Sequence, residues 1–179
     1  MTALHDTIPD TTPAPIAWGT YAKDSNMHFF LCDFIDMTDE VPDIQRFVIK
    51  VAELHTKGAS PNGKYGFSTP TFMGRVAQYV EWTESWEEFF TNSMLRLMSI
   101  IEASEGPDPE FKELFRQIID KVIPRLLRPL ETGGRQIRPS LIHGDLQSGN
   151  VSVDNVTGAP ILYDAPSLYA HNECKLNES

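Results

Sequence analysis

Residues 141–150 of this chain read LIHGDLQSGN, and residues 161–164, which follow a polar turn and a short strand, read ILYD. The first stretch presents His143, Asp145 and Asn150 in an H-x-D-x-x-x-x-N spacing. Each residue is common alone, but the three at these intervals, followed by an apolar run that ends in aspartate, form an uncommon joint pattern. This pattern indicates an enzyme site, and the rest of the chain is interpreted around it.

Three oxygen-bearing side chains in and after this stretch match the needs of phosphoryl transfer. Such a site requires a carboxylate that accepts the proton of the acceptor hydroxyl, and oxygen ligands for Mg²⁺ on the phosphates of ATP. Asp145 can supply the carboxylate, and Asn150 with Asp164 can supply the metal ligands. His143 is expected to support the loop by hydrogen bonds, and a direct acid or base role for it is the less favoured alternative. Alone, Asp145 would be interpreted as a turn or helix cap.

The composition is that of a globular protein with one ordinary domain. The chain has 179 residues, of which 41% are hydrophobic and 22% are charged, so it is long enough to bury its own core. Its formal net charge of −10 argues against a nucleic-acid partner, because phosphate contacts need a basic face. It does not argue against ATP, whose charge is handled locally by a metal ion and a few donors.

The sequence carries no signal for a membrane. It lacks an apolar run of about 18 residues, and its N-terminus lacks the basic and then apolar plan of a signal peptide, so we expect no membrane partner. Cys32 and Cys174 are the two cysteines, and they are not in a metal-ligand spacing. We expect free thiols in a reducing compartment, and therefore a cytoplasmic protein.

The N-terminal part of the chain divides into a leader and a hairpin. Residues 1–14 are rich in Thr, Pro and Asp, and we expect them to form a disordered leader. Residues 15–37 hold two aromatic and β-branched runs around a Lys-Asp-Ser-Asn turn at residues 23–26. This predicts an antiparallel hairpin that continues into a linker.

Three helices are expected next, each with start and stop signals. Apolar side chains recur at helical intervals over residues 43–57 and are followed by a glycine. A Ser-x-x-Glu capping box opens the second helix at residue 85, and Gly106 ends it. Asp-Pro at residues 108–109 opens the third helix, which Pro124 should kink or shorten.

Short strands are expected around the polar motif. They lie near residues 140–143, 151–153 and 160–163, and the last two are joined by a turn. Residues 58–74 contain four Gly and two Pro and are expected to form a loop. Helices dominate and the strands form small hairpins, so we predict an α+β fold.

Further strings outside the motif point to one family. They are PIAWG at 15–19, LH at 54–55, KYGF at 64–67, EW at 81–82, WEEFF at 86–90 and YAHNE at 169–173. With the HGDL and SGN segments at the centre, the chain resembles the C-terminal lobe of the aminoglycoside phosphotransferase-like kinases, which have a protein-kinase-like fold. Among these it is most similar to the fructosamine (ketosamine) kinase family, over residues 15–173.

The resemblance implies roles for the residues of the motif. Asp145 matches the catalytic aspartate that orients and deprotonates the acceptor hydroxyl, and Asn150 and Asp164 match the Mg²⁺ ligands. His143 matches the loop histidine of the family. These are the residues to which the spacing alone already points.

The resemblance also implies residues for the two substrates. Asp33, Phe34 and Ile35 would form the linker between the lobes, where backbone groups meet the adenine edge of ATP. His171 and Glu173 could touch the acceptor, although an ordinary surface pair is an equally good interpretation. In the family the acceptor is the sugar part of a ketoamine, either a small molecule or a glycated protein lysine. These enzymes phosphorylate the 3-hydroxyl of the sugar and are therefore fructosamine or ribulosamine 3-kinases. The phosphorylation destabilises the adduct, which gives the family a role in protein deglycation.

Some features depart from the family pattern. Gln147 stands where Trp is usual, Ala165-Pro166 replaces Pro-Ala, and Ala170 replaces Gly. No Gly-rich loop, strand lysine or partner glutamate precedes the hairpin. We therefore expect residues 15–37 to be a remnant N-lobe hairpin and hinge, residues 38–179 to be a C-terminal lobe that is incomplete at its end, and the N-terminal lobe to be largely missing. For this polypeptide we expect weak or no turnover.

Two alternatives to a ketoamine kinase remain open. One is an inactive kinase-lobe remnant that acts only in binding. The other is a sibling small-molecule kinase with another hydroxyl acceptor, which the KYGF and EW strings make less favoured.

Four aromatic residues could form a platform for the sugar, but their helical spacing favours a role in the core. They are Trp82, Trp86, Phe89 and Phe90.

Overall fold

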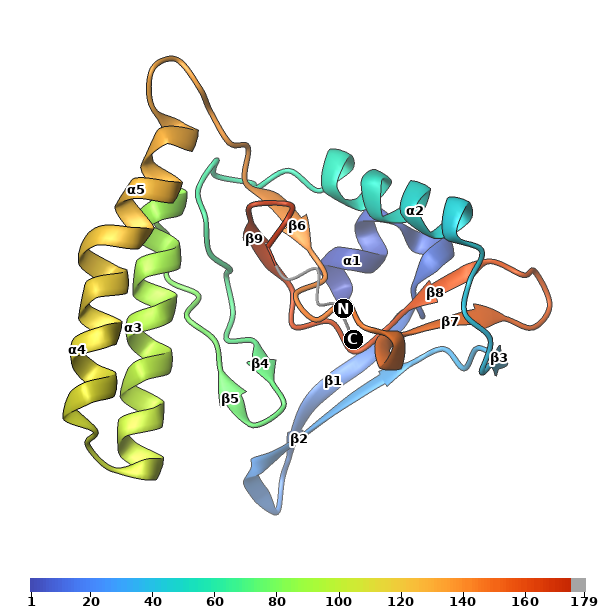
Figure 1. Cartoon of the computed structure of the whole chain (residues 1–179). Coiled ribbons are helices and arrows are strands. Elements are labelled where there is room, and N and C mark those ends of the chain that lie inside the picture. Colours follow the sequence, from blue (N-terminus) through green and yellow to red (C-terminus); the bar gives the residue numbers. More distant parts are fainter. Residues whose placement is uncertain (175–179) are drawn as a thin grey trace. The chain divides into compact units, whose positions relative to one another are not determined.

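The polar motif lies between short strands, as predicted. The structure is a computed structural model that describes residues 1–174, and residues 175–179 of the expected C-terminal lobe lie outside it. The chain divides into two units (Figure 1). The first comprises residues 1–58, 141–167 and 173–174, and the second comprises residues 59–140 and 168–172. Helices and strands are mixed, which agrees with the predicted α+β class, whereas its assignment to a kinase C-terminal lobe stays a prediction.

In the first unit, the N-terminal residues belong to the core. Helix α1 (Thr2–Thr7) and the 3₁₀ turn η1 (Pro9–Thr11) occupy the stretch that we expected to be disordered. Leu4 and Ile8 are completely buried. The prediction of a disordered leader is therefore wrong, because tertiary burial of a few apolar side chains stabilises a helix too short to persist alone.

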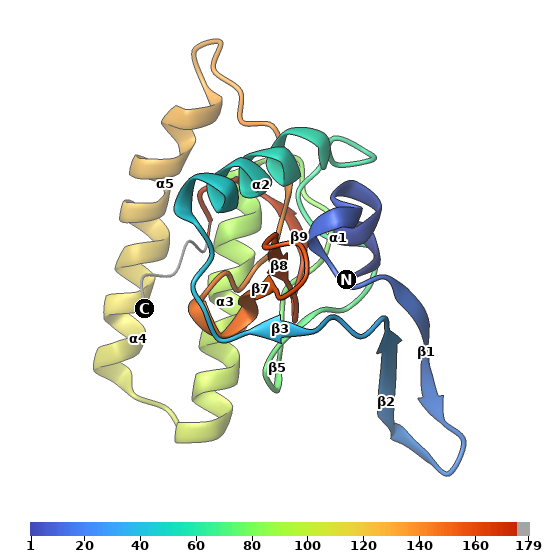
Figure 2. The ribbon, with the colours of Figure 1, turned by 90° about the vertical axis from the view of Figure 1, so that its right-hand side faces the viewer.

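The predicted antiparallel hairpin is present. It consists of β1 (Pro15–Tyr21) and β2 (Asp24–Cys32), with Trp18 opposite Phe30. The turn falls at residues 22–23, slightly earlier than predicted. Large apolar side chains are exposed on both faces of this ribbon, including Trp18 at 65%, and Figure 2 shows the ribbon extending away from α1.

A three-stranded antiparallel sheet carries the end of the polar motif. Strand β7 (Val151–Asp154) lies between β3 (Met37–Thr38) and β8 (Pro160–Leu162). The β7–β8 hairpin was predicted, whereas β3 was not, because two residues are too few to show a period. Ser152 Oγ donates a hydrogen bond to Thr38 O, which fixes the chain just after the predicted linker to β7.

Helix α2 (Ile44–Lys57) confirms the first predicted helix. Asp43 caps its N-terminus by accepting a hydrogen bond from Arg46 N at 2.9 Å, and Gly58 follows its last turn. Leu141 N donates to Gly58 O at 2.6 Å. The chain therefore leaves the first unit after Gly58 and returns to it at the same place.

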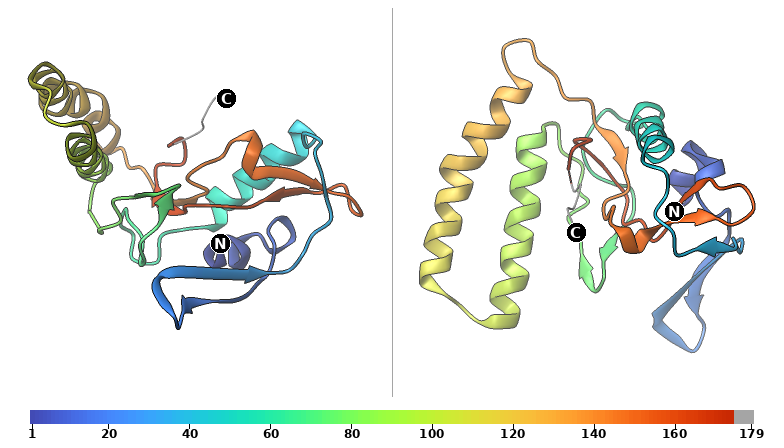
Figure 3. Two further views of the ribbon diagram at one scale, coloured as in Figure 1. Left: turned by 90° about the horizontal axis from the view of Figure 1, so that it is seen from below. Right: turned by 45° about the vertical axis from the view of Figure 1, so that its right-hand side comes forward.

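The second unit is built around two helical rods. One is α3 (Trp86–Glu105), and the other runs continuously through α4 (Pro109–Gln117), the π-helical segment η2 (Ile118–Val122) and α5 (Ile123–Leu127). Figures 1 and 3 show the rods side by side. The 3₁₀ turn η3 (Arg128–Glu131) ends the second rod. Both helices were predicted.

Pro124 changes the hydrogen bonding of the second rod without ending it. Proline lacks an N–H, and its ring clashes with the carbonyl four residues earlier in a regular α-helix. The wider π-helical turn at Ile118–Val122 directly precedes α5 and gives the ring room. We predicted that Pro124 would kink or shorten this helix, whereas the structure shows that the helical rod continues past Pro124 with a local change of helix type.

The core of the second unit is aromatic. Tyr65, Trp86 and Phe89 are 1%, 4% and 2% exposed, which confirms the core interpretation for the last two. Trp82 stacks on Tyr169, with ring centroids 6.0 Å apart. Strands β4 (Phe72–Met73) and β5 (Val76–Ala77) form a hairpin inside and beyond the predicted loop. Strand β9 (Leu168–Ala170) also lies in this unit.

Candidate active site

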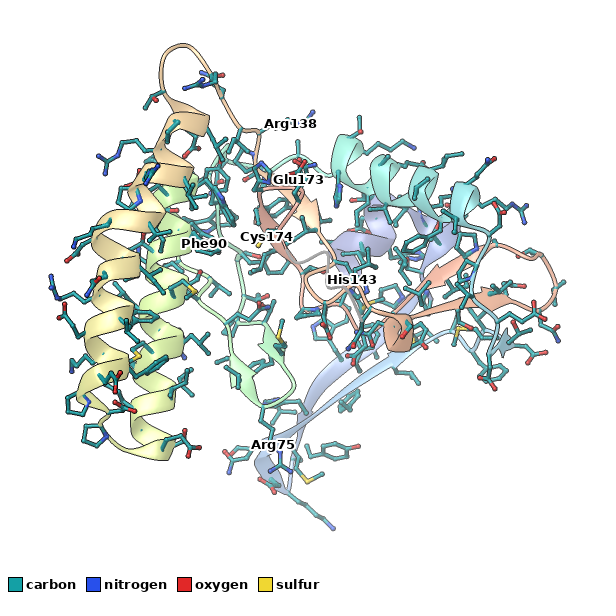
Figure 4. All side chains as sticks on the ribbon, viewed as in Figure 1. Arg75, Phe90, Arg138, His143, Glu173 and Cys174 are labelled. Atoms are coloured by element: carbon teal, nitrogen blue, oxygen red, sulfur yellow. The ribbon has the colours of Figure 1, made fainter. Side chains whose placement is uncertain are left out.

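The polar motif forms a loop between β6 (Ser140–Ile142) and β7 that its own side chains hold together. His143, labelled in Figure 4, follows β6 and is 2% exposed. Its Nδ1 accepts a hydrogen bond from Asp145 N at 3.3 Å, and its Nε2 donates to Tyr163 O at 3.0 Å. The imidazole therefore ties the start of the loop to the end of β8.

The environment of His143 favours its neutral form. Burial lowers the pKa of the imidazole, although the hydrogen bond to Tyr163 and the charges of Asp145 and Asp164 act in the opposite direction. Both carboxylates thus lie close enough for their charges to act on the ring. A neutral ring with both nitrogens hydrogen-bonded to the protein fits the supporting role that we predicted for it.

Two amide groups orient the carboxylate of Asp145. Asn150 Nδ2 donates to Asp145 Oδ2 at 3.0 Å and to Asp145 O at 2.8 Å. Gln147 Nε2 donates to the same Oδ2 at 3.1 Å. The sequence predicted that Asp145 and Asn150 lie together, but it did not predict the contact with Gln147, which we noted only as a departure. A long amide side chain two residues after the aspartate was the available signal.

The backbone around these residues is sharply bent. Gly144 has φ of +94°, and a Cβ there would meet the backbone of Pro166. Asp164 has φ of +55° and is the one residue other than glycine with positive φ in the described part of the chain. Such a conformation costs energy and is often found at functional sites. Tyr163 N donates to Asn150 O at 3.1 Å, so Asp164 directly follows a residue bound to the loop.

The predicted adenine-contacting linker belongs to the same unit. Asp33 N donates to the backbone oxygen of Ala14 at 2.9 Å, and Ile35 is half-buried. The side chain of Phe34 is 90% exposed. Next to this linker, Asn155 Nδ2 in the β7–β8 turn donates to the Asp36 carboxylate at 3.0 Å. Both ends of the linker are therefore hydrogen-bonded to other residues of the first unit.

The two predicted acceptor-contacting residues fall in different units. His171 lies in the second unit, with its ring 6.0 Å from that of Trp86. Glu173 lies in the first unit and is exposed. A role for either residue at the acceptor stays a prediction.

A cavity of about 650 Å³ opens within the first unit beside the loop. One side is formed by residues 38–42 with Ile44, Phe47 and Val48, and the other by residues 146–149 with Val151, Ser152 and Tyr163. Gln147 lines this cavity and also contacts Asp145. No local pattern pointed to the cavity, because its lining residues come from two segments about a hundred residues apart along the chain.

The donors near Asp145 fit a magnesium ion that is shared with phosphates. Both hydrogen bonds of the Asn150 side chain use its Nδ2, which leaves the carbonyl Oδ1 as a hard oxygen ligand. Mg²⁺ usually takes one or two carboxylates together with substrate phosphates and water. Among residues 1–174, no three His, Cys, Asp or Glu side chains cluster as metal ligands. The assignment of Asn150 and Asp164 as the ligands of this ion stays a prediction.

The comparison with known proteins identifies the family. The fructosamine kinase family model matches residues 1–178. The chain belongs to the fructosamine kinase family. A protein-ribulosamine 3-kinase of rice, named as chloroplastic, is 28% identical over 179 residues, and the alignment covers all of this chain and 49% of that protein. The ketosamine-3-kinase of mouse is 37% identical over 114 residues, which are 63% of this chain and 34% of that protein.

The solved structures support the same fold. A crystal structure from Thermobifida fusca, named as a candidate fructosamine-3-kinase, superimposes with a TM-score of 0.71 at 20% identity. The match covers 95% of this chain and 53% of that one. At this identity the likeness shows the fold alone. This fructosamine kinase family member spans about half the length of the rice relative and of the solved structure.

The location of this family member does not follow from the family. None of the helices in residues 1–174 is long and apolar enough to span a bilayer. The name of the rice relative places that protein in the chloroplast. The cytoplasmic location therefore stays a prediction from composition.

Proposed function

We propose that the chain carries the catalytic loop of an ATP-dependent kinase that phosphorylates the 3-hydroxyl of the sugar part of ketoamines. The acceptors are fructosamines and ribulosamines, including glycated protein lysines, and the role is deglycation. The observation that carries this proposal is the Asp145 carboxylate, oriented by Asn150 and Gln147 in a fructosamine kinase family chain. In this proposal residues 15–37 correspond to N-lobe and linker, and residues 38–179 to the C-terminal lobe.

The chemistry assigned to the loop is proton transfer coupled to phosphoryl transfer. The 3-hydroxyl gives its proton to the Asp145 carboxylate while its oxygen forms a bond to the γ-phosphorus of ATP. The bond from that phosphorus to the bridging oxygen breaks, and ADP leaves. Asn150 and Asp164 would hold Mg²⁺, which neutralises charge on the phosphates when bound. His143 keeps the loop in place, and the backbone of residues 33–35 contacts the adenine.

The test of this proposal is transfer of the γ-phosphoryl group to a ketoamine. The 179-residue protein is incubated with Mg-ATP and Nα-acetyl-fructosyl-lysine, and the phosphorylated product is quantified by mass spectrometry. Asp145→Asn should lower the rate at least about 100-fold, because a positioned general base contributes roughly that much or more. Its thermal melt should stay near that of the unchanged protein, since Asn keeps the size of the side chain.

A matched control replaces an exposed aspartate of the second unit. Asp120→Asn makes the same chemical change at a side chain that is 50% exposed, and it should leave the transfer rate unchanged. Equal rates for Asp145→Asn and the unchanged protein would refute the assignment of the base. If the unchanged protein binds neither Mg-ATP nor the ketoamine at millimolar concentration, the proposal fails and a role without catalysis takes its place.

A further inference from the structure

The second helical rod exposes an apolar stripe in addition to the side that it buries. Phe115 and Ile123 belong to the core of the second unit and are 8% and 3% exposed. Large apolar side chains also recur at intervals of three and four residues on α4, η2 and α5 with exposures between 39% and 61%: Phe111, Leu114, Ile118, Val122 and Leu126. A helix that packs on one core needs a single stripe, and a second, exposed stripe marks an interaction surface.

The π-helical segment keeps this stripe on one side of the rod. With about 3.6 residues per turn of α-helix, each four-residue step moves the next side chain about 40° around the axis. The turn at Ile118–Val122 is wider, which removes part of this drift because more residues fill one turn. The stripe therefore runs nearly straight over residues 111–126, a length of roughly 20 Å. Figures 1 and 3 show the rod at the edge of the second unit.

A row of polar side chains beside the stripe changes its charge along the rod. Each member precedes one stripe residue in the sequence, and the row reads Glu110, Glu113, Gln117, Lys121 and Arg125. Its N-terminal end is acidic, its middle is neutral and its C-terminal end is basic. Among the ion pairs of residues 1–174, none involves Glu110, Lys121 or Arg125. The two ends of the row therefore carry charges that the described chain does not pair.

A second copy of the chain in antiparallel orientation matches both the stripe and the row. If Ile118 packs on its own equivalent across a two-fold axis, the equal intervals bring Leu114 close to Val122 of the second copy. The same alignment brings Glu110 opposite Arg125 of the second copy, and a two-fold axis makes each such contact twice. A parallel alignment would instead bring like charges together. The charge of the row is thus complementary to itself in one orientation.

We infer that this face of the α4–α5 rod is a dimer interface between two copies of this chain, paired antiparallel about Ile118. Burial of the stripe supplies the affinity, because it removes apolar surface from water on both copies. The row of charges sets the orientation, since opposite charges meet in this alignment alone. The inference does not depend on phosphoryl transfer, and its test measures the mass of the assembly.

Sedimentation equilibrium of the 179-residue protein between about 1 and 100 µM should show a monomer that associates to a dimer. Leu114→Gln should weaken the dimer at least about tenfold, because an amide then enters the apolar contact twice. The control Leu31→Gln makes the same change at a side chain of similar exposure in the first unit, 52% against 55%, and should leave the dimer unchanged. A protein that stays monomeric, or a control that weakens the dimer as much as Leu114→Gln, overturns the inference.

Charge reversal in two separate proteins tests the orientation, and it does not depend on the folding of Leu114→Gln. Glu110→Lys and Arg125→Glu each place like charges opposite one another twice, so each should weaken its own dimer about tenfold. An equimolar mixture of the two proteins should recover the affinity of the unchanged protein, because the new lysine of one faces the new glutamate of the other. If the mixture associates no better than either protein alone, the antiparallel pairing is wrong and the inference is overturned.

Discussion

Substitution of Gly144 by alanine tests whether the bend before Asp145 is required for the fold of the first unit. Its φ of +94° costs a residue with a Cβ about 1–2 kcal/mol. An added Cβ would also lie 3.0 Å from the carbonyl carbon of Pro166 and closer still to its oxygen. Because that neighbour is backbone, relief requires a main-chain shift of about 1–3 kcal/mol. Gly144→Ala should therefore destabilise the protein by about 2–5 kcal/mol.

Urea and thermal unfolding, followed by circular dichroism, measure this loss. For a chain of this size each kcal/mol lowers the melting temperature by about 2–4 °C, so a fall of between about 4 and 20 °C is expected for Gly144→Ala. Two glycines of the same unit serve as controls. Gly158 has φ of +65° with only the end of a flexible side chain at 3.4 Å, so Gly158→Ala should show the backbone cost alone. Gly149 has open space and no positive φ, so Gly149→Ala should be nearly neutral.

The test depends on the ranking of the three variants by stability. If Gly144→Ala is no less stable than Gly158→Ala, the contact with Pro166 does not constrain the loop. Our account of how the loop is held would then be wrong.

Four further predictions follow from single contacts. Leu4→Ala should lower the free energy of unfolding in urea by about 2–5 kcal/mol, because Leu4 is completely buried. A loss below about 1 kcal/mol would instead support the disordered leader predicted from the sequence. Asp108→Ala should cost about 0.5–2 kcal/mol, since Asp108 Oδ1 accepts from two amides of α4 at 3.0 Å, and an unchanged melt would contradict the cap. Glu131→Gln should cost about 1.5–3 kcal/mol, because the Glu131 oxygens accept separately from Tyr65 Oη and from Trp86 N, both at 2.7 Å, and an amide offers one oxygen. Burial lowers the pKa of His143, so the histidine of the unfolded chain is protonated at a higher pH than that of the folded protein. The stability that neutral His143 contributes is therefore complete above about pH 6.5 and is lost as pH falls through the lower folded pKa. The difference in unfolding free energy between the unchanged protein and His143→Gln should become smaller from about pH 8 to about pH 5, and a constant difference would contradict this prediction.

The helices were predictable because their signals are local. Asp43, Ser85 and Asp108 each accept a hydrogen bond from an amide of the first turn, as their positions before apolar periodic runs suggested. Gly106 ends α3 with φ of +86°. Caps of this kind depend on a few neighbouring residues, so the sequence alone is enough to predict where these helices begin and end.

Other elements depend on contacts that no local pattern encodes. Helix α1 has six residues and no side-chain cap, and its stability comes from the burial of Leu4 by distant parts of the chain. Strand β3 pairs with β7 more than a hundred residues later. The π-helical segment before Pro124 is one of several ways in which a helix accommodates proline, and tertiary packing selects among them.

The site was predictable in its spacing but not in its geometry. The H-x-D-x-x-x-x-N pattern identified a loop in which Asp145 is hydrogen-bonded to both His143 and Asn150. The sequence shows that the Gln147 side chain is long enough to reach Asp145, but the bond itself depends on a rotamer, and the positive φ of Asp164 depends on a strained backbone. Both are set by the whole environment of the loop. The catalytic roles of these residues stay predictions.

The hydrogen bond between Leu141 N and Gly58 O has a practical consequence for dissecting this polypeptide. Because Gly58 and Leu141, which flank residues 59–140, are hydrogen-bonded at 2.6 Å, that stretch is an insertion in the sense used for nested domains, and such points tolerate rejoining. A short glycine-containing bridge in place of residues 59–140 would leave 97 residues of the chain, among them α1, the linker and the Asp145 loop. Cutting the chain once, by contrast, separates residues that must fold together.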